Sequence, residues 1–123
     1  MAHSFEDAVN NILRRHDEYA PDVYDFLRQA MNTTARQYNR DEHNKHLSAE
    51  ELYMGVCALA LEEFGPLAKS VMAYWGVFDG SDVGRIVFYM VEAGIFRKEE
   101  DDNMEQFLRL PSMSTMLDTP YCS

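Results

Sequence analysis

The sequence predicts a mainly α-helical fold of about five helices, with a winged-helix-like C-terminal half that ends in a small β-hairpin. Three observations support this prediction. Apolar residues recur at helical spacing over most of the chain, and capping residues, prolines and glycines stand where helices would begin and end. The segment GIFRKEEDDNMEQF then places two short apolar stretches on either side of a polar tip. We expect one helical domain over residues 1–108 and an irregular tail over residues 109–123.

The two N-terminal helices are predicted near residues 4–15 and 21–38. Ser4 is the expected cap of the first helix, and Pro21 suits the start of the second because its missing N–H costs nothing there. The polar segment 39–46 has no apolar residue and is expected to be a solvated linker. Helical spacing assigns two apolar stripes to the core: Phe5, Ala8, Val9, Ile12 and Leu13 in the first helix, and Val23, Phe26, Leu27, Ala30, Met31 and Thr34 in the second.

The third and fourth helices are predicted near residues 48–64 and 66–75, and a Gly-Pro pair separates them. Ser48 begins the third helix with a capping box, because a glutamate follows three residues later. Gly65 is able to take the left-handed conformation that ends this helix, and Pro66 is suited to begin the next one on a new axis. The sequence therefore predicts a sharp corner between these two helices.

The single tryptophan of the chain, Trp75, stands at the end of the fourth helix, and Gly76 follows it. Helical spacing places this ring on one apolar face with Leu67, Val71 and Tyr74. We interpret this face as buried, with the indole acting as a wedge that fixes the angle between the third and fourth helices. A ligand-binding platform is the alternative interpretation of the ring.

The fifth helix is predicted near residues 82–93, with Ser81 as its cap and Gly94 at its end. A hairpin near residues 95–107 is expected to follow, although a competing interpretation makes residues 103–109 a short helix. A short helix, a tight turn, a second helix and a hairpin in this order are typical of a winged helix.

Composition narrows the classes of partner and compartment. The 123 residues include 21 acidic and 11 basic ones, which gives a net charge of −10. An acidic surface repels phosphate, so nucleic acid is disfavoured as a partner. No apolar run reaches the roughly 18 residues of a membrane span, and the N-terminus lacks the pattern of a signal peptide. Because Cys57 lies in an apolar helix and Cys122 is next to last, a disulfide is disfavoured, and we expect a cytoplasmic protein.

Four stretches carry a resemblance to a known family: FEDAVNNIL, YAPDVYDFLRQAM, HLSAEELYMGVCALALEEFGPLAKSVMAYWGV and DVGRIVFYMVEAGIF. In these stretches the chain resembles a small family of conserved hypothetical proteins of planctomycetes and verrucomicrobia. The resemblance covers residues 5–107, its most specific part runs from EEFGPLA to WGV, and the tail after residue 108 does not share it. It implies a bacterial, soluble protein and supplies no catalytic residue.

Motifs for metal binding or catalysis are weak. His43 and His46 stand three positions apart beside Asp41 and Glu42, and zinc or nickel accepts these ligand types, but a charged linker contains such residues by chance. Paired carboxylates are adjacent in sequence and so do not face each other on a helix. Phosphate-loop, dinucleotide and nucleophile-elbow motifs are absent from the sequence. We therefore expect no cofactor and no catalytic residue.

The interpretation with most support is a non-enzymatic adaptor or regulator that acts through contacts with a partner protein or through self-association. The fifth helix is apolar on nearly all sides, and its candidate contact residues outside the predicted core stripe are Arg85, Phe88, Tyr89 and Glu92. Burial of the two aromatic rings under the tail is the competing explanation. A winged-helix DNA-binding regulator is the alternative function, although Arg85 is the one cation that this helix offers to base edges. An enzyme of unknown class is the third.

Overall fold

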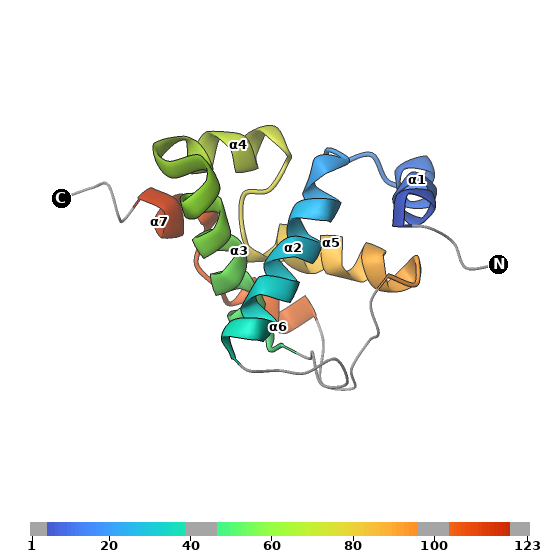
Figure 1. Ribbon diagram of the computed structural model, residues 1–123. Helices are drawn as coiled ribbons and strands as arrows, with labels where there is room; N and C mark the ends of the chain where they lie inside the picture. Colours follow the sequence, from blue (N-terminus) through green and yellow to red (C-terminus); the bar gives the residue numbers. More distant parts are fainter. Residues whose placement is uncertain (1–4, 39–46, 96–103, 119–123) are drawn as a thin grey trace.

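The computed structural model describes residues 5–38, 47–95 and 104–118, and these segments are mainly helical (Figure 1). The mainly α fold class is therefore confirmed. None of the helices in these segments has the length and apolar composition that crossing a membrane requires. In chain order the elements are α1 (Phe5–Arg15), α2 (Asp22–Gln37), α3 (Ala49–Phe64), the 3-10 helix η1 (Gly65–Leu67), α4 (Ala68–Tyr74), α5 (Gly80–Glu92), α6 (Met104–Leu108) and α7 (Met113–Asp118).

Helices α2 and α3 pack against each other at the centre of the molecule, and the other helices surround them (Figure 1). Gly55 lies where α3 meets α2: a Cβ atom added there would come within 2.0 Å of the Thr34 hydroxyl oxygen. Glycine therefore permits this close approach. Helices α4 and α7 pack together at one end of the molecule, α1 lies against α5 at the other, and α6 packs on α5.

Every α-helix contributes apolar side chains to the core. On the central pair of helices, Tyr24 and Leu27 of α2 and Tyr53 and Val56 of α3 are fully buried. Cys57 is buried among them as predicted, and burial raises the pKa of its thiol to about 12. Helix α5 contributes three more fully buried side chains: Val83, Ile86 and Met90.

The predicted start of α3 is confirmed in atomic detail. The Ser48 hydroxyl accepts a hydrogen bond from the Glu51 amide at 3.0 Å, and the Glu51 carboxylate accepts one from the Ser48 amide at 2.9 Å. This reciprocal pair satisfies two of the amide groups that the first turn of a helix leaves without partners. Leu47, immediately before the cap, is buried together with Leu52.

The Gly-Pro corner after α3 also forms. Gly65 has a φ of 54° and a ψ of −130°, so its φ is positive as predicted, but its ψ is extended rather than helical. Residues other than glycine rarely adopt this conformation. Pro66 lies in η1, and the chain passes through this 3-10 turn before α4 begins. Gly76 and Gly94, predicted to end the fourth and fifth helices, also have positive φ values, 95° and 81°.

Helix α5 begins earlier than predicted, and Asp79 rather than Ser81 is its cap. The Asp79 carboxylate accepts a hydrogen bond from the Asp82 amide at 3.2 Å, and the Asp82 carboxylate accepts one from the Asp79 amide at 3.3 Å. The Ser81 hydroxyl donates to the Asp79 carboxylate instead of capping the helix. The earlier start places Gly80 against α6, where an added Cβ atom would lie 2.3 Å from the Phe107 carbonyl oxygen.

The prediction of a hairpin near residues 95–107 is wrong for its return strand. Residues 104–108 form α6, as in the competing short-helix interpretation, and Phe107 is buried. The close approach at Gly80 lets α6 pack on α5, so Phe107 reaches the core from a helix rather than from a strand. The predicted first strand starts at Ile95, and its other residues lie outside the described ones. The described residues therefore show no wing.

The tail predicted to be irregular contains a helix, α7. Met113 and Leu117, four positions apart, are both buried, and α7 packs on α3 and α4. The Ser112 hydroxyl accepts a hydrogen bond from the Thr115 amide at 3.2 Å, which caps the helix. The Met113 amide donates to the Phe78 carbonyl at 2.9 Å. Two prolines and several serines suggested a loop, but Pro-Ser followed by apolar residues at helical spacing is also a helix start.

Candidate functional site

Helix α4 presents an apolar face to solvent, so the prediction that this face is buried is wrong for Leu67, Val71 and Tyr74. Trp75, the fourth residue of the predicted face, packs against the core. Leu67 is 65% exposed and Tyr74 is 86% exposed, and Val71, which lies between them at helical spacing, is partly exposed. The buried residues of the helix are instead Ala68 and Met72. Both belong to the hydrophobic core, and α4 packs against α3 and α7. We call Leu67, Val71 and Tyr74 the α4 surface.

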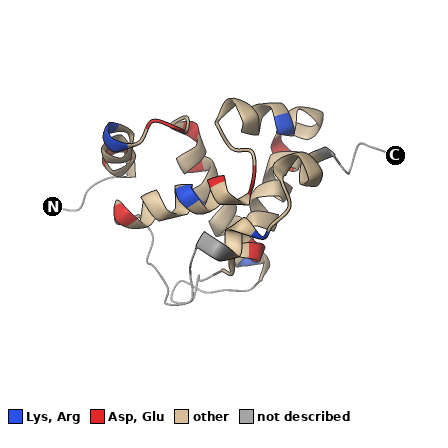
Figure 2. Ribbon diagram, turned by 180° about the vertical axis from the view of Figure 1, so that it is seen from behind, with Lys and Arg blue, Asp and Glu red and all other residues tan. Residues whose placement is uncertain are grey.

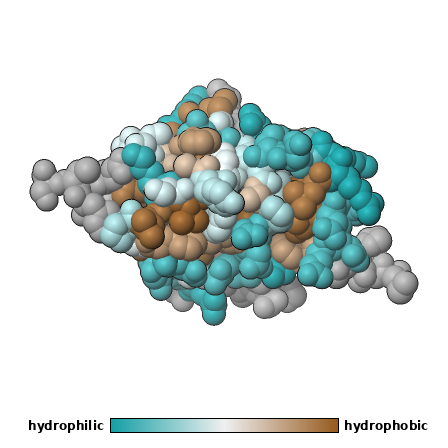
Figure 3. All heavy atoms as spheres, turned by 90° about the horizontal axis from the view of Figure 1, so that it is seen from above, coloured by the Kyte–Doolittle hydropathy of each residue, from teal (hydrophilic) through white to brown (hydrophobic). Residues whose placement is uncertain are grey.

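The neighbourhood of the α4 surface combines apolar and acidic side chains. Figure 3 shows apolar side chains over the half of the molecule that carries α4, and a second group of them over the other half. Lys and Arg residues are few and scattered in the part of the chain that Figure 2 colours. Glu62 and Glu63 directly precede the corner that leads to α4, and the one cation of α4, Lys69, is engaged within the chain.

A hollow of about 320 Å³ lies where α2 and the C-terminal ends of α3 and α4 meet, and we call it the acid–aromatic hollow. Three aromatic rings form part of its wall. The ring centroid of Phe26 lies 5.8 Å from that of Phe64 and 5.2 Å from that of Trp75, and the centroids of Phe64 and Trp75 are 5.7 Å apart. The indole thus contacts both α2 and α3 at the corner. The remaining lining residues are Asp22, Asp25, Gln29 and Glu63.

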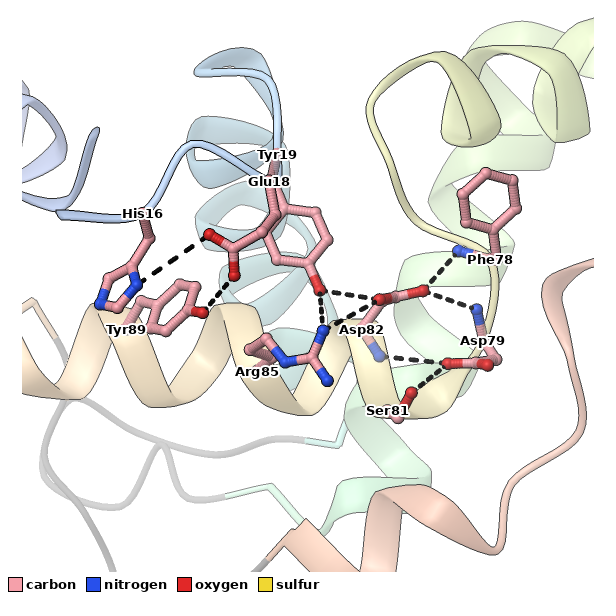
Figure 4. Close-up of polar contacts among 9 residues, drawn as sticks. All are labelled: His16, Glu18, Tyr19, Phe78, Asp79, Ser81, Asp82, Arg85 and Tyr89. Atoms are coloured by element: carbon pink, nitrogen blue, oxygen red, sulfur yellow. Dashed lines mark hydrogen bonds and ion pairs between the residues drawn. The ribbon is translucent and has the colours of Figure 1, made fainter. Parts of the chain in front are cut away.

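The four contact residues predicted on α5 do not share one environment. Arg85, Phe88 and Glu92 are exposed, and Phe88 is 50% exposed, whereas Tyr89 is only 7% exposed. The expectation that both aromatic rings lie outside the core is therefore wrong for Tyr89. The segment between α1 and α2 covers this ring (Figure 4).

Two residues of that segment, His16 and Glu18, hold Tyr89. The imidazole stacks on the phenol ring, with centroids 3.8 Å apart and an interplanar angle of 7°. The Tyr89 hydroxyl donates a hydrogen bond to the Glu18 carboxylate, and the second oxygen of this carboxylate lies 4.0 Å from His16 Nδ1 (Figure 4). These contacts fasten α5 to the segment before α2 and leave Tyr89 unavailable to a partner.

The hydrogen bond between Tyr89 and Glu18 shifts the pKa of both groups. It favours the carboxylate form and so lowers the pKa of Glu18 below its ordinary value of 4.5. Burial, together with the same hydrogen bond, raises the pKa of Tyr89 to about 12. The phenol is therefore neutral and the carboxylate ionised around neutral pH. Neither group is poised to exchange a proton there, as a general acid or base would have to be.

A second polar network surrounds Asp82 near the start of α5 (Figure 4). The Tyr19 hydroxyl donates to Asp82 Oδ1 at 2.7 Å, and Arg85 Nη1 lies 3.3 Å from the Tyr19 hydroxyl oxygen and 3.8 Å from Asp82 Oδ1. The other carboxylate oxygen accepts a hydrogen bond from the Phe78 amide at 2.9 Å. Both oxygens of Asp82 are thus occupied by groups of the chain itself. This network positions the segments that precede α2 and α5.

A second hollow, of about 370 Å³, lies between the C-terminal turns of α1 and α5. Arg14 donates a hydrogen bond to Asn11 at 3.3 Å, and it ends α1 together with Arg15, where the helix dipole favours cations. Glu92 on the α5 side opposes the binding of an anion. Two arginines and one glutamate thus bring charges of both signs to this hollow. Its lining residues are Asn11, Ile12, Arg14, Arg15, His16, Tyr89, Glu92 and Ala93.

Comparison with known proteins assigns no function to these residues. No protein-family model, curated protein or solved structure matches the chain. The resemblance in residues 5–107 remains an expectation from the sequence, and the function has to be argued from the arrangement of the side chains.

The weak metal candidates, His43 and His46, lie outside the described residues and stay a prediction. Within the described segments, no group of three or more histidine, cysteine, aspartate or glutamate side chains is arranged to hold a metal ion. Residues 16–18 are a histidine, an aspartate and a glutamate in sequence. The carboxylate of this glutamate, Glu18, accepts a hydrogen bond from Tyr89.

Sequence reasoning missed the α4 surface and both hollows. The hollows have no signal in the sequence, because each is formed by residues of different helices. The α4 surface has an ambiguous signal, since two apolar faces of the helix have the same spacing and periodicity alone does not tell which is buried. These faces are Leu67, Val71 and Tyr74 on one side, and Ala68, Met72 and Trp75 on the other.

Proposed function

We propose that the protein is a non-enzymatic adaptor or regulator that binds a partner protein through the α4 surface. The observation that carries this proposal is the outward orientation of Leu67, Val71 and Tyr74 in a helix that buries Ala68 and Met72. Large apolar side chains grouped on an exposed helix face lose contact with water favourably when another protein covers them. Aromatic anchors covered in this way supply much of the affinity of a protein interface.

The partner that fits this surface is a protein segment with both apolar and basic side chains. The chain has a net charge of −10, and Glu62 and Glu63 lie at the corner beside α4. A second copy of the chain would bring the same negative charge, so electrostatic repulsion opposes self-association. A basic partner is attracted over a distance and is also oriented by the acidic border of the surface.

The exposed side chains of α5 form a second candidate surface with less apolar area. Phe88 is exposed there between Arg85 and Glu92, but Tyr89 is held by the chain itself. This surface therefore offers a partner one exposed large apolar side chain, whereas the α4 surface offers two, Leu67 and Tyr74, together with the partly exposed Val71. We accordingly assign the partner to α4 and keep Phe88 as the comparison site.

The alternative function, DNA binding by a winged helix, receives less support. Arg85, the cation that α5 would offer to base edges, lies within reach of Tyr19 and Asp82 of the same chain. An arginine that reads a base needs its guanidinium free to approach the major groove.

Site-specific crosslinking tests the assignment to α4. A benzophenone amino acid replaces Tyr74 in one variant and Phe88 in another, and each protein is irradiated in the cytosol of the source cell. We expect a crosslinked protein from position 74 and none from position 88. The same protein, once purified, is expected to bind the wild type roughly ten-fold or more tightly than it binds Leu67→Glu, because a buried charge without a partner opposes association.

Ser70→Glu is the matched control for this experiment, because it adds the same charge at an exposed position of α4 outside the α4 surface. Equal binding of the partner by Leu67→Glu and Ser70→Glu, or crosslinks from position 88 alone, would refute the assignment to α4. Sedimentation of the wild type alone is measured in parallel. A dimer that Leu67→Glu dissociates would show that a second copy, and not a basic partner, occupies the surface.

A further inference from the structure

The acid–aromatic hollow exposes aromatic ring surface to solvent at the end of α4. Phe64 and Trp75 are partly exposed there, and Phe26 behind them is buried. The indole meets the other two rings edge to face, with interplanar angles of 62° and 83°, so the rings hold one another in place. A cation on the face of such a ring is attracted by its quadrupole, by about 0.5–1 kcal/mol at exposed sites.

Two of the three carboxylates at this hollow have no ion-pair partner among the residues that the structure describes. Asp25 pairs with Arg28 at 2.8 Å. Asp22 and Glu63 form no ion pair within the described segments. The hollow thus carries negative charge that a cation from outside would compensate.

The helix ends around the hollow add to this preference. Helices α3 and α4 both end there, and the C-terminal end of a helix carries a partial negative charge. Helix α2 begins there and contributes the opposite partial charge, but Asp22 and Asp25 in its first turn offset it. The electrostatics of the backbone and of the side chains therefore both favour a cation.

The molecule already contains the arrangement that such a cation would form. The guanidinium carbon of Arg28 lies 3.8 Å from the centre of the Phe5 ring, and the same guanidinium pairs with Asp25. A planar guanidinium is thus placed on a ring and bound to a carboxylate at the same time. The acid–aromatic hollow offers a ring and a carboxylate without the cation.

We propose that the acid–aromatic hollow accepts a guanidinium or alkylammonium side chain, an arginine or a lysine, of the partner protein. Trp75 in the hollow directly follows Tyr74 of the α4 surface, so one partner segment is able to reach both. The volume of about 320 Å³ lies at the lower end of the range of small-molecule pockets and leaves room for a single side chain. In this form the inference rests on the proposed function, since it names the chemistry by which the partner is recognised.

The single tryptophan of the chain makes a direct test available. The indole N–H of Trp75 gives one resonance in an NMR spectrum, and it is followed while a blocked tripeptide with a central arginine is added at constant ionic strength. The comparison peptide has citrulline in place of arginine, which keeps the shape of the side chain and removes its charge. We expect a saturable shift with a dissociation constant on the order of millimolar for the arginine peptide, and several-fold weaker binding of the citrulline peptide.

Two variants show whether the hollow itself binds the peptide. Glu63→Gln is expected to weaken binding of the arginine peptide several-fold. Glu62→Gln is the matched control, because it removes the same charge from a neighbouring exposed residue that does not line the hollow. Thermal melts of both variants verify the fold. Equal weakening by the two variants, equal binding of the two peptides, or a response that does not saturate would overturn the proposal.

The outcome is separable from that of the crosslinking experiment, because the peptide titration needs no natural partner. Loss of partner binding in Leu67→Glu together with an unresponsive Trp75 resonance would retain the proposed function and refute the cation site. A saturable and charge-dependent shift of the resonance, with a natural partner that does not contact α4, would establish the cation site and refute the α4 assignment.

Discussion

Two buried tyrosine hydroxyls in the central helices differ in their hydrogen bonding. The Tyr53 hydroxyl donates to the Pro111 carbonyl at 2.5 Å and so ties α3 to the residues before α7. The Tyr24 hydroxyl is buried and has no hydrogen-bond partner among the described residues. Burial also raises the pKa of both phenols, because the ionised form would lose its hydration. A buried polar group without a partner costs free energy that a satisfied one does not.

Removal of these two hydroxyls should therefore have different effects. We expect Tyr24→Phe to leave the free energy of unfolding unchanged or to raise it, and Tyr53→Phe to lower it by about 1 kcal/mol. Urea denaturation with unchanged m values measures both. An equal loss in the two variants would mean that the Tyr24 hydroxyl has a partner, such as a buried water molecule.

The pair formed by Glu18 and Tyr89 should make stability depend on pH. The folded state lowers the pKa of Glu18, so the pair contributes stability that is present above the ordinary value of 4.5 and is lost as the pH falls through the folded value. Tyr89→Phe removes this contribution. We expect the difference in melting temperature between wild type and Tyr89→Phe to be largest around neutral pH and to shrink on acidification.

At alkaline pH the stability that the pair contributes depends on pH in the opposite direction. Because the pKa of Tyr89 is raised from 10.0 to about 12, its contribution is complete below the lower value and is lost as the pH rises through the higher one. Tyr74→Phe is the control, since Tyr74 is exposed and lies outside the pair. A difference between wild type and Tyr89→Phe that stays constant from about pH 7 to about pH 3 would contradict the role assigned to the hydrogen bond.

At the scale of the elements, local signals predicted helix positions better than helix orientations. The capping box at Ser48 and the Gly65-Pro66 corner depend on neighbouring residues, and the structure has both. The orientation of α4 depends instead on what the rest of the chain leaves for it to pack against, and two faces of equal period compete. The prediction for Tyr89 on α5 is wrong for a related reason: a segment about seventy positions earlier in the chain buries this ring, and the periodicity of α5 carries no information about that segment.

Helix α7 should contribute to stability although the sequence made it look like a tail. Truncation after Leu110 removes Met113 and Leu117, which are both buried, and we expect it to lower the free energy of unfolding by several kcal/mol. Truncation after Asp118 keeps these contacts and is the matched control. Urea denaturation of the two truncated proteins measures the difference, and equal midpoints would show that α7 adds nothing to the core.

At the scale of the whole molecule, charge sets the expected class of partner. With a net charge of −10 and scattered cations, the surface has no basic stripe in its described part to neutralise phosphates (Figure 2). We expect no binding to random duplex DNA at micromolar protein and near-physiological salt. Electrophoretic mobility measurements at several salt concentrations check this. A salt-dependent complex that Arg85→Ala abolishes would favour the winged-helix alternative over the adaptor.

The peripheral position of α1 has a consequence for how the molecule opens. This helix lies at one end and packs mainly against α5, and its described buried side chains are Ala8, Val9 and Ile12 (Figure 1). Its separation would uncover much less apolar area than opening the pair α2 and α3, so it should form a cooperative unit of its own with a low free energy of opening. In native-state hydrogen exchange, we expect the amides of α1 to exchange together and ahead of those of α3. The molecule would then spend part of its time with its N-terminal helix undocked while the α4 surface and the acid–aromatic hollow keep their shape.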